Sequence, residues 1–374
     1  MTATLAALQR GAEVHLHVVD LVTGGTLLEC RPDALLIPAS TQKLMTASAV
    51  LAARPLETQL VTSIVLMPAA DGVPANVVVS GAGDALLDAD AVRSLASAAA
   101  AALPLGNITL SAAQGPFAGP DLGEGWMWDD GLEELRVLPL RLHGSTRADQ
   151  PLDLLELVAA AFRQHGHVVE VSAKARNMSG TAPARVLARF QRPLAESLRA
   201  ALLDSDNLVA ECLLRLAGGA DQSAAAGLAS VRNMLEFRGV DAAKLRFADG
   251  SGVSRYNLTT ARTLTTLLRT EELRHPGRLR SFLPVSGRTG TLSKRYKGSA
   301  AEGRIIAKTG TLEGLAVLAG YMQDATGREL VFAMSVQAAV APAAELRSIM
   351  DTFLTGLVSA PSGIATLHMA SQRL

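Results

Sequence analysis

The sequence predicts an α/β protein of the α+β type, in which an antiparallel sheet is flanked by helices and a smaller domain is inserted. Alternating apolar residues near the amino terminus predict one strand pair, and the same alternation in the last quarter of the chain predicts three more strands. From residue 54 to residue 183 the pattern changes to short strands and turns. We therefore expect a main domain of residues 1–53 and 184–374, split by an insert at residues 54–183.

The first elements are a hairpin and a helix. Val14–Asp20 and Thr26–Cys30 alternate around a Thr-Gly-Gly turn, which is typical of a β-hairpin. Pro38 then leads into a helix that starts near Ser40 and carries Lys43.

The insert combines short strands with helices. Residues 62–67 and 76–80 read as strands, and residues 152–165 as a helix. The Ala-rich stretch at 94–105 predicts an ordinary buried helix, because it is too short to span a bilayer.

The chain then returns through helices to the sheet. We expect a helix at residues 194–203, an antiparallel meander of strands at 305–311, 315–323 and 329–337, a helix at 343–357, and a weakly specified tail at 358–374.

Composition excludes several partners. The formal net charge is zero and no long basic or acidic block occurs, which argues against nucleic-acid binding. We expect no transmembrane segment, and residues 1–10 lack the basic and apolar regions of a signal peptide. Aromatic residues make up only 3%, so the core must consist mainly of Ala, Leu and Val. Cys30 and Cys212 are expected to be buried, inert thiols rather than a disulfide.

Three short motifs in a fixed order predict a serine acyl-transfer site: Ser40-Thr41-Gln42-Lys43, Ser205-Asp206-Asn207 and Lys308-Thr309-Gly310-Thr311. A serine hydroxyl needs a neighbouring base. Because positions i and i+3 share one helix face, Lys43 should lie one turn above the Ser40 hydroxyl. Lys43 can act as a base only if burial or a nearby cation lowers its pKa, and Lys308 supplies that cation.

The second motif supplies a proton carrier and an amide. We expect Ser205 to return a proton to the leaving amine, and Asn207 to orient Lys43 and hold a substrate amide. Each motif alone has a common structural reading: the first as a solvated helix start, the second as a helix N-cap before residues 208–216, the third as a strand running into a turn. The three motifs together, in this order, favour the acyl-transfer site.

The third motif predicts an edge strand that binds a peptide. Gly310 would let a ligand backbone approach closely. A peptide can pair along this strand, with Lys308 and Thr309 receiving its C-terminal carboxylate. The backbone N–H groups of Ser40 and Thr311 would form the oxyanion hole.

With these motifs, the chain resembles the class C, low-molecular-mass penicillin-binding proteins, which form peptidase family S13. Further segments support the resemblance, which covers most of the chain and is densest between Leu194 and Gln337. They are Gly81-Ala82-Gly83-Asp84, Gly125-Trp126-Met127-Trp128-Asp129-Asp130, Asp249-Gly250-Ser251-Gly252-Val253-Ser254-Arg255, Gly290-Thr291-Leu292 and the run from Gly303 to Tyr321.

The resemblance implies a serine β-lactamase/penicillin-binding transpeptidase-like fold, with the split main domain as the penicillin-binding catalytic domain. It implies a D-alanyl-D-alanine carboxypeptidase/endopeptidase that cuts peptidoglycan stem peptides through an acyl-enzyme and is acylated by β-lactams. It implies no metal and no organic cofactor. It also implies a periplasmic or extracytoplasmic location, with the leader removed. Members usually carry a longer insert folded as two domains, so we expect one of them to be lost or vestigial here.

Two further residues are candidates for substrate side-chain recognition. Arg255 could bind a carboxylate on the stem peptide, because a guanidinium pairs with carboxylates through two hydrogen bonds. Glu313, two residues beyond Thr311, could meet an ammonium group. Asp129 and Asp130 are assigned a structural or substrate-contact role.

Two alternatives remain open. A β-lactamase or esterase on the same fold would share the nucleophile and deacylate rapidly. An inactive peptidoglycan-binding scaffold would have kept the fold alone, although all three motifs are intact.

Overall fold

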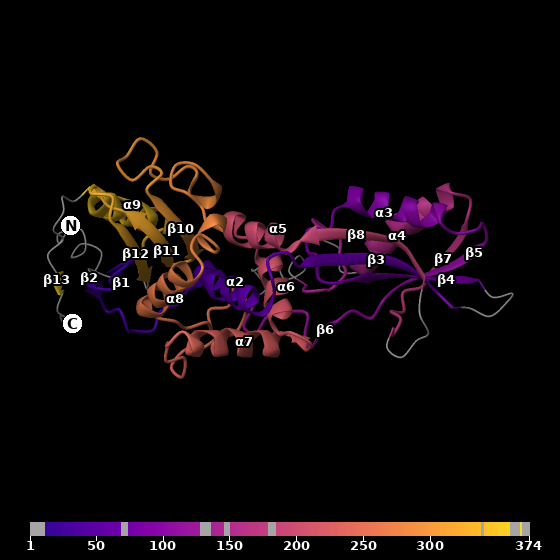
Figure 1. Cartoon of the computed structure of the whole chain (residues 1–374), viewed down its shortest axis with the longest axis horizontal. Coiled ribbons are helices and arrows are strands. Elements are labelled where there is room, and N and C mark those ends of the chain that lie inside the picture. Colours follow the sequence, from indigo (N-terminus) through magenta and orange to yellow (C-terminus); the bar gives the residue numbers. More distant parts are fainter. Residues whose placement is uncertain are drawn as a thin grey trace.

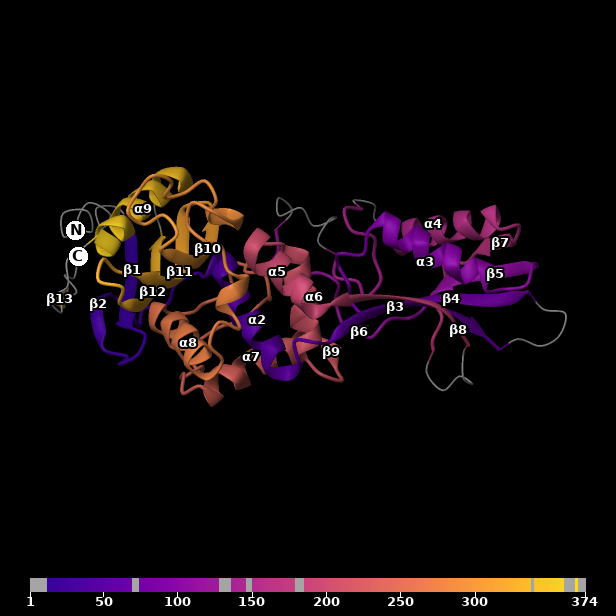
Figure 2. The same cartoon turned by 45° about the horizontal axis from the view of Figure 1, so that its top comes forward.

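The computed structural model describes residues 12–68, 74–127, 136–145, 150–178, 185–337, 340–359 and 367–368. The molecule is elongated, with one sheet near each end and a group of helices between the two sheets (Figure 1). The same arrangement is visible after rotation by 45° about the horizontal axis (Figure 2).

The first sheet joins the two ends of the chain. Its strand order is β10-β11-β12-β1-β2-β13, and every pair is antiparallel except β2 with β13. The strands are β1 Glu13–Asp20, β2 Thr26–Cys30, β10 Ile305–Leu312, β11 Leu315–Gln323, β12 Glu329–Gln337 and β13 Leu367–His368. The predicted hairpin and meander are confirmed, and β10 is the predicted edge strand.

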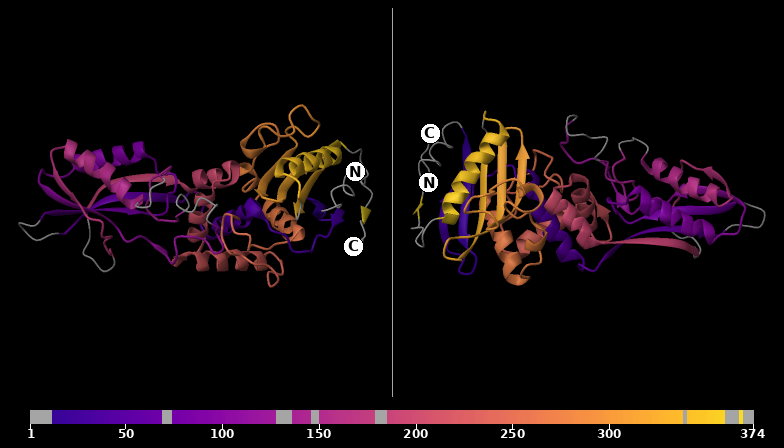
Figure 3. Two further views of the ribbon diagram at one scale, coloured as in Figure 1. Left: turned by 180° about the vertical axis from the view of Figure 1, so that it is seen from behind. Right: turned by 90° about the horizontal axis from the view of Figure 1, so that it is seen from above.

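Both faces of this sheet are covered by helices. On β12, Phe332 and Met334 pack with helix α9 (Ala343–Ser359), while Val331 and Ala333 face the opposite side and pack with α8 (Ala261–Arg274). This two-residue period is that of a strand buried on both faces. The left view of Figure 3 shows α9 (yellow) and α8 (orange) on opposite sides of the first sheet. The predicted antiparallel sheet flanked by helices is confirmed.

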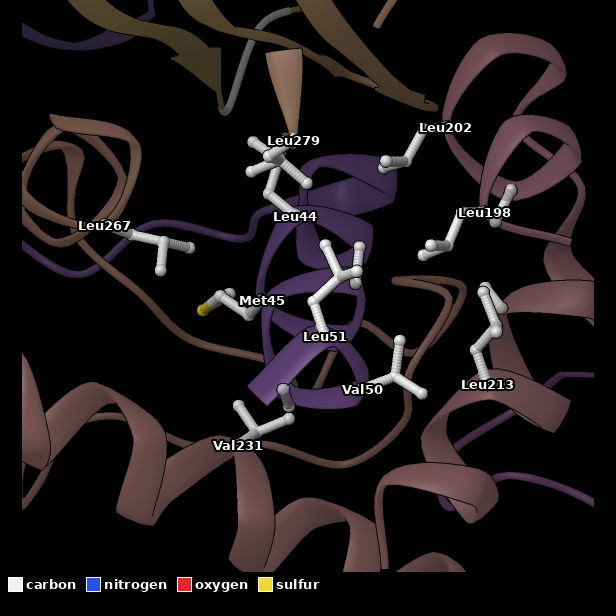
Figure 4. Close-up of a cluster of buried hydrophobic side chains, with 14 of the residues drawn as sticks. Leu44, Met45, Val50, Leu51, Leu198, Leu202, Leu213, Val231, Leu267 and Leu279 are labelled. Atoms are coloured by element: carbon white, nitrogen blue, oxygen red, sulfur yellow. The ribbon is translucent and has the colours of Figure 1, made fainter. Parts of the chain in front are cut away.

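Helix α2 (Gln42–Ala53) lies at the centre of the largest core. All of its residues from Gln42 to Leu51 are buried. Leucine and valine side chains from the surrounding elements converge on it, among them Leu198, Leu213 and Val231 (Figure 4). The surrounding helices are α5 Leu194–Arg199, α6 Asn207–Ala217 and α7 Ala224–Phe237. Because few aromatic side chains are present, the packing around α2 is made mainly of aliphatic groups.

The second sheet is mixed, with strand order β7-β5-β4-β3-β8. Its strands are β3 Gln59–Met67, β4 Ala75–Gly81, β5 Asn107–Ala112, β7 Val168–Val171 and β8 Arg185–Pro193. Helices α3 (Ala89–Ala101) and α4 (Gln150–Gln164) pack on this sheet around a separate core. A short pair, β6 Phe117–Ala118 with β9 Gln222–Ser223, joins this part to the helices around α2.

Several elements differ from the expectations. We placed residues from 184 onward in the main domain, but β8 pairs with β3 along its whole length in the second sheet. Arg185 and Arg189 break the apolar pattern of β8, which is tolerated because β8 is an edge strand. Arg192 also breaks the pattern, but its side chain is held by the buried carboxylate of Asp84. The division into a split catalytic domain and a shortened insert stays a prediction. The strands β5 and β7 and the helices α7 and α8 were not predicted.

Other predictions concern single features. Both cysteines are buried, as predicted. In the part of the chain that the structure describes, no helix combines the length and apolarity needed to cross a membrane. Of the predicted tail, only β13 lies within the described residues after Ser359.

Candidate active site

Ser40 and Lys43 lie at the start of the central helix. We expected Ser40 at the start of the α-helix. It lies instead in the 3₁₀ turn Ala39–Thr41, which precedes the α-helix. Ala39 has a φ of 45°, an unusual conformation for a residue with a side chain. This turn places the Ser40 hydroxyl 3.0 Å from the amine of Lys43, and the predicted pair is therefore present.

The amine of Lys43 has two further partners. It donates to Asn207 Oδ1 at 2.7 Å and to the carbonyl oxygen of Ser251 at 2.7 Å. The Lys43 side chain is buried, and this burial lowers its pKa to about 8, although the carboxylates of Asp249 and Glu211 partly oppose the shift. Lys43 is thus poised to lose its proton near neutral pH.

The partners of Lys43 also define where its free electron pair points. A carbonyl oxygen and the amide oxygen of Asn207 can only accept hydrogen bonds, so they take two N–H groups of the amine. The third direction faces the Ser40 hydroxyl, which can donate or accept. A neutral Lys43 can therefore accept the hydroxyl proton of Ser40 without moving.

A second lysine and serine form a matching pair. Lys308 donates from its amine to Ser205 Oγ at 2.8 Å and to the carbonyl oxygen of Thr309 at 2.9 Å. Lys308 is fully buried, and its pKa lies well below the usual value because of burial and, second, because of Lys43. The second lysine that we predicted is therefore present, but the pKa of Lys43 is lowered by its own burial rather than by Lys308.

Ser205 occupies a strained position. It follows the π-helical turn Ala200–Asp204, which ends α5, and has the left-handed values φ 67° and ψ 30°. Residues other than glycine and asparagine rarely adopt this conformation, and such strain is typical of functional sites. Asp206 then caps α6 by accepting the N–H of Val209 at 2.9 Å. The N-cap residue Asp206 thus stands between the two proposed site residues of this motif, Ser205 and Asn207.

The edge strand β10 passes beside the 3₁₀ turn that carries Ser40. On its outer side, the Ala307 N–H donates to the carbonyl of Pro284 at 3.0 Å. Because the direction of the backbone N–H and carbonyl groups alternates along a strand, Thr309 and Thr311 also direct these groups to the outer side of β10. The Thr309 hydroxyl meets that of Thr291 at 2.8 Å.

Gly310 is needed for a reason that differs from our expectation. A Cβ atom there would lie 2.9 Å from the carbonyl oxygen of Pro38 and 3.1 Å from the backbone nitrogen of Ser40. The missing side chain therefore admits the protein's own nucleophile turn against β10.

Behind Lys43 lies the loop of residues 249–252. Asp249 is buried and accepts the N–H groups of Gly252 at 2.8 Å and Ser254 at 2.6 Å. The indole N–H of Trp126 reaches the same carboxylate at 2.9 Å. The segment that we recognised by resemblance thus forms the wall behind the base.

The two candidates for side-chain recognition lie together at the surface. Arg255 is exposed and donates to the carbonyl oxygen of Glu313 at 3.2 Å, and the side chain of Glu313 is exposed. Asp129 and Asp130 lie outside the described residues.

Sequence reasoning missed Glu211 and Thr291. Glu211 lies one helical turn after Asn207, so the spacing offered a signal, but its buried contacts are made with residues 250 and 251, which are distant in sequence. In the described part of the chain, no three His, Cys, Asp or Glu side chains gather as metal ligands would.

The chain is similar to known proteins. A model of the D-Ala-D-Ala carboxypeptidase 3 (S13) family matches residues 2–135 and 141–357. The carboxypeptidase DacB of Mycolicibacterium smegmatis is 30% identical over 354 residues, which cover 85% of this chain and 75% of that protein.

Solved structures share the fold. Penicillin-binding protein 4 (dacB) from Haemophilus influenzae has a TM-score of 0.82 at 20% identity, covering 96% of this chain and 99% of its own. Its complex with a β-lactam has a TM-score of 0.76 at 20% identity and covers 95% of this chain and 98% of that one. A predatory peptidoglycan endopeptidase from Bdellovibrio bacteriovorus has a TM-score of 0.61 at 14% identity, covering 93% and 92%.

Replacing Gly252 by Ala tests the contact between the 249–252 loop and the nucleophile turn. Gly252 has a φ of 82°, and a Cβ there would overlap with the carbonyl group of Ala39. We expect the free energy of unfolding to fall by more than the 1–3 kcal/mol that a strained backbone alone costs. Gly298→Ala is the matched control, since Gly298 has a φ of 70° and no atom within 4 Å of the added Cβ. Equal losses in the two variants, measured by denaturant unfolding, would contradict the close contact.

Proposed function

The chain belongs to the D-Ala-D-Ala carboxypeptidase 3 (S13) family, and from this premise we propose the roles of its site residues. The protein is a serine-type D-Ala-D-Ala carboxypeptidase. One observation carries the assignment of roles: two buried lysine amines each contact one serine hydroxyl, Lys43 with Ser40 and Lys308 with Ser205. Two such pairs supply a nucleophile with its base and a second hydroxyl that can move a proton.

We assign Ser40 as the nucleophile and Lys43 as its general base. The neutral amine of Lys43 takes the hydroxyl proton while Ser40 Oγ forms a bond to the carbonyl carbon of the terminal D-Ala-D-Ala peptide bond. The carbonyl oxygen gains the negative charge and is stabilised by the N–H groups of Ser40 and Thr311. Asn207 keeps Lys43 oriented through its amide oxygen.

Ser205 completes the first half of the reaction. When the carbon–nitrogen bond breaks, the leaving amine of D-alanine needs a proton, which Ser205 supplies while it takes up the proton that Lys43 removed from Ser40. Lys308 holds the Ser205 hydroxyl in place, and its amine would bind the substrate carboxylate. Water then attacks the acyl-enzyme: Lys43 accepts a proton from the water and returns it to Ser40 Oγ as the acyl carbon–oxygen bond breaks.

The substrate we propose is a peptidoglycan stem peptide ending in D-Ala-D-Ala, which would be met outside the cytoplasmic membrane. Its backbone would pair with the outer side of β10 at Thr309 and Thr311, and its C-terminal carboxylate would meet Lys308 and the Thr309 hydroxyl. Gly310 keeps this stretch of β10 against the nucleophile turn. The same groups could cut crosslinks between D-Ala and diaminopimelate, as a DD-endopeptidase does, if the cleft admits a second chain.

Arg255 and Glu313 are proposed to recognise the third-residue side chain of the stem peptide. Arg255→Ala should raise the KM for a diaminopimelate-type peptide about tenfold or more, because a charged hydrogen-bond partner is lost, but leave a truncated peptide nearly unaffected. Steady-state hydrolysis of both peptides measures this. Arg274→Ala is a control, since Arg274 is also exposed but stacks on Phe237. An equal loss on both peptides contradicts the assignment.

The pH dependence of acylation tests Lys43 as the base. Because its pKa is about 8 and the reaction needs the neutral amine, the acylation rate constant should rise about tenfold per pH unit from pH 6 and level off above pH 8. Rapid quench and intact-mass analysis with benzylpenicillin would measure it.

A second buried group titrates in the same range, so a control is needed. Burial raises the pKa of Glu211 to about 8, and the nearby charge of Asp249 contributes a smaller shift in the same direction. In Glu211→Gln the rise with pH should persist and move slightly to lower pH, since a neighbouring negative charge is removed. Equal rates at pH 6 and pH 8 in the parent would exclude Lys43 as the base.

Intact-mass analysis after incubation with benzylpenicillin tests the function itself. We expect one adduct on the parent, none on Ser40→Ala, and persistence of the adduct over hours. Rapid loss of the adduct with turnover of the drug would indicate a β-lactamase instead. Absence of an adduct, together with no release of D-alanine from a stem peptide, would indicate a silent scaffold.

A further inference from the structure

The loop of residues 249–252 binds the central helix through its carbonyl groups. Three successive carbonyl oxygens, those of residues 249, 250 and 251, accept hydrogen bonds from α2. The donors are Gln42 at 3.3 Å, Thr46 at 2.7 Å and Lys43 at 2.7 Å. The last of these bonds holds the amine that we propose as the general base.

The opposite side of the same loop is held by a single carboxylate. Glu211 Oε1 accepts the N–H of Gly250 at 2.9 Å and the N–H of Ser251 at 2.7 Å. Glu211 is only 4% exposed, and it lies four residues after Asn207 on α6. Since residues four apart share a helix face, α6 reaches Lys43 in two ways: directly through Asn207, and through the loop by way of Glu211.

We propose that Glu211 is a positioning residue for acyl transfer, which fixes the Gly250–Ser251 peptide so that the Ser251 carbonyl holds Lys43 against Ser40. Glu211 acts through the loop, and the contacts that it makes are with the two amides. The inference rests on the proposed roles of Ser40 and Lys43.

The chemistry of the loop explains why an acceptor is needed here. Asp249 holds the end of the loop through the N–H groups of Gly252 and Ser254, whereas Glu211 accepts the N–H groups of Gly250 and Ser251. Glycine at 250 adds conformational freedom to the part of the backbone that Glu211 holds. Two amides buried without an acceptor would each carry the cost of an unmade hydrogen bond. The loop would then rotate toward other partners, and the carbonyl that meets Lys43 would turn with it.

The experiment compares Glu211→Ala with Glu211→Gln. A glutamine oxygen can accept both amide N–H groups, as Oε1 does, whereas alanine accepts neither. We expect the acylation rate constant with benzylpenicillin, per titrated active site, to fall about tenfold or more in Glu211→Ala and to stay within about threefold of the parent in Glu211→Gln. The dissociation constant of the initial complex should change little in both variants.

Two further variants keep the test valid if Glu211→Ala folds poorly. Thr46→Val removes the hydroxyl that donates to the Gly250 carbonyl, from the other side of the loop, and should lower the same rate constant by a smaller factor. Phe353→Leu loosens the separate core under α9 and should lower the melting temperature without changing the rate per active site.

The outcomes separate the possibilities. Glu211→Ala acylating at the parental rate, or Glu211→Gln losing as much as Glu211→Ala, overturns the positioning role. A change confined to the initial complex also overturns it. If the parent itself forms no adduct on Ser40, it is the proposed function that fails.

Discussion

Two lysine amines are kept out of water within hydrogen-bond distance of two serine hydroxyls, and the rest of the structure depends on this arrangement. An ammonium group buried in this way loses its hydration, so both pKa values fall, and a neutral amine becomes accessible near physiological pH. Burial alone would not orient the amines toward the serine hydroxyls. Acceptors from α6, from the 249–252 loop and from β10 fix each of them in direction.

The architecture around α2 follows from that requirement. A helix whose first ten residues are all buried must be surrounded on every side, and here the first sheet, α6, α7 and α8 cover it. Aliphatic residues meet this demand without large aromatic side chains, which agrees with the low aromatic content of the chain. The second sheet has its own core, and the loop that follows β6 reaches the site through the bond between Trp126 and Asp249.

The sequence predicted the parts whose signals are local. Alternation identified β1, β2 and the meander of β10 to β12. The three motifs identified the Ser40–Lys43 pair and named Ser205 and Lys308 as site residues, but not the contact between these two. Helix α8 was missed because it is rich in threonine, which has a low helix propensity, and tertiary packing compensates for this. The left-handed backbone of Ser205 has no local cause in the sequence. Glu211 was missed because its partners lie about forty residues away, across a contact that only the fold creates.

The outer side of β10 is short. Upstream, the carbonyl of Ile305 and the N–H of Ala307 are already taken by Ser286 and Pro284, which leaves Thr309 and Thr311 as the outward-facing residues that can still pair. Long open strand edges recruit other chains and promote aggregation. Here the free stretch is long enough for the end of a small peptide but too short to template a strand from a second copy of the protein. The same blockage that limits what can dock therefore also limits strand pairing between two copies of the protein along β10.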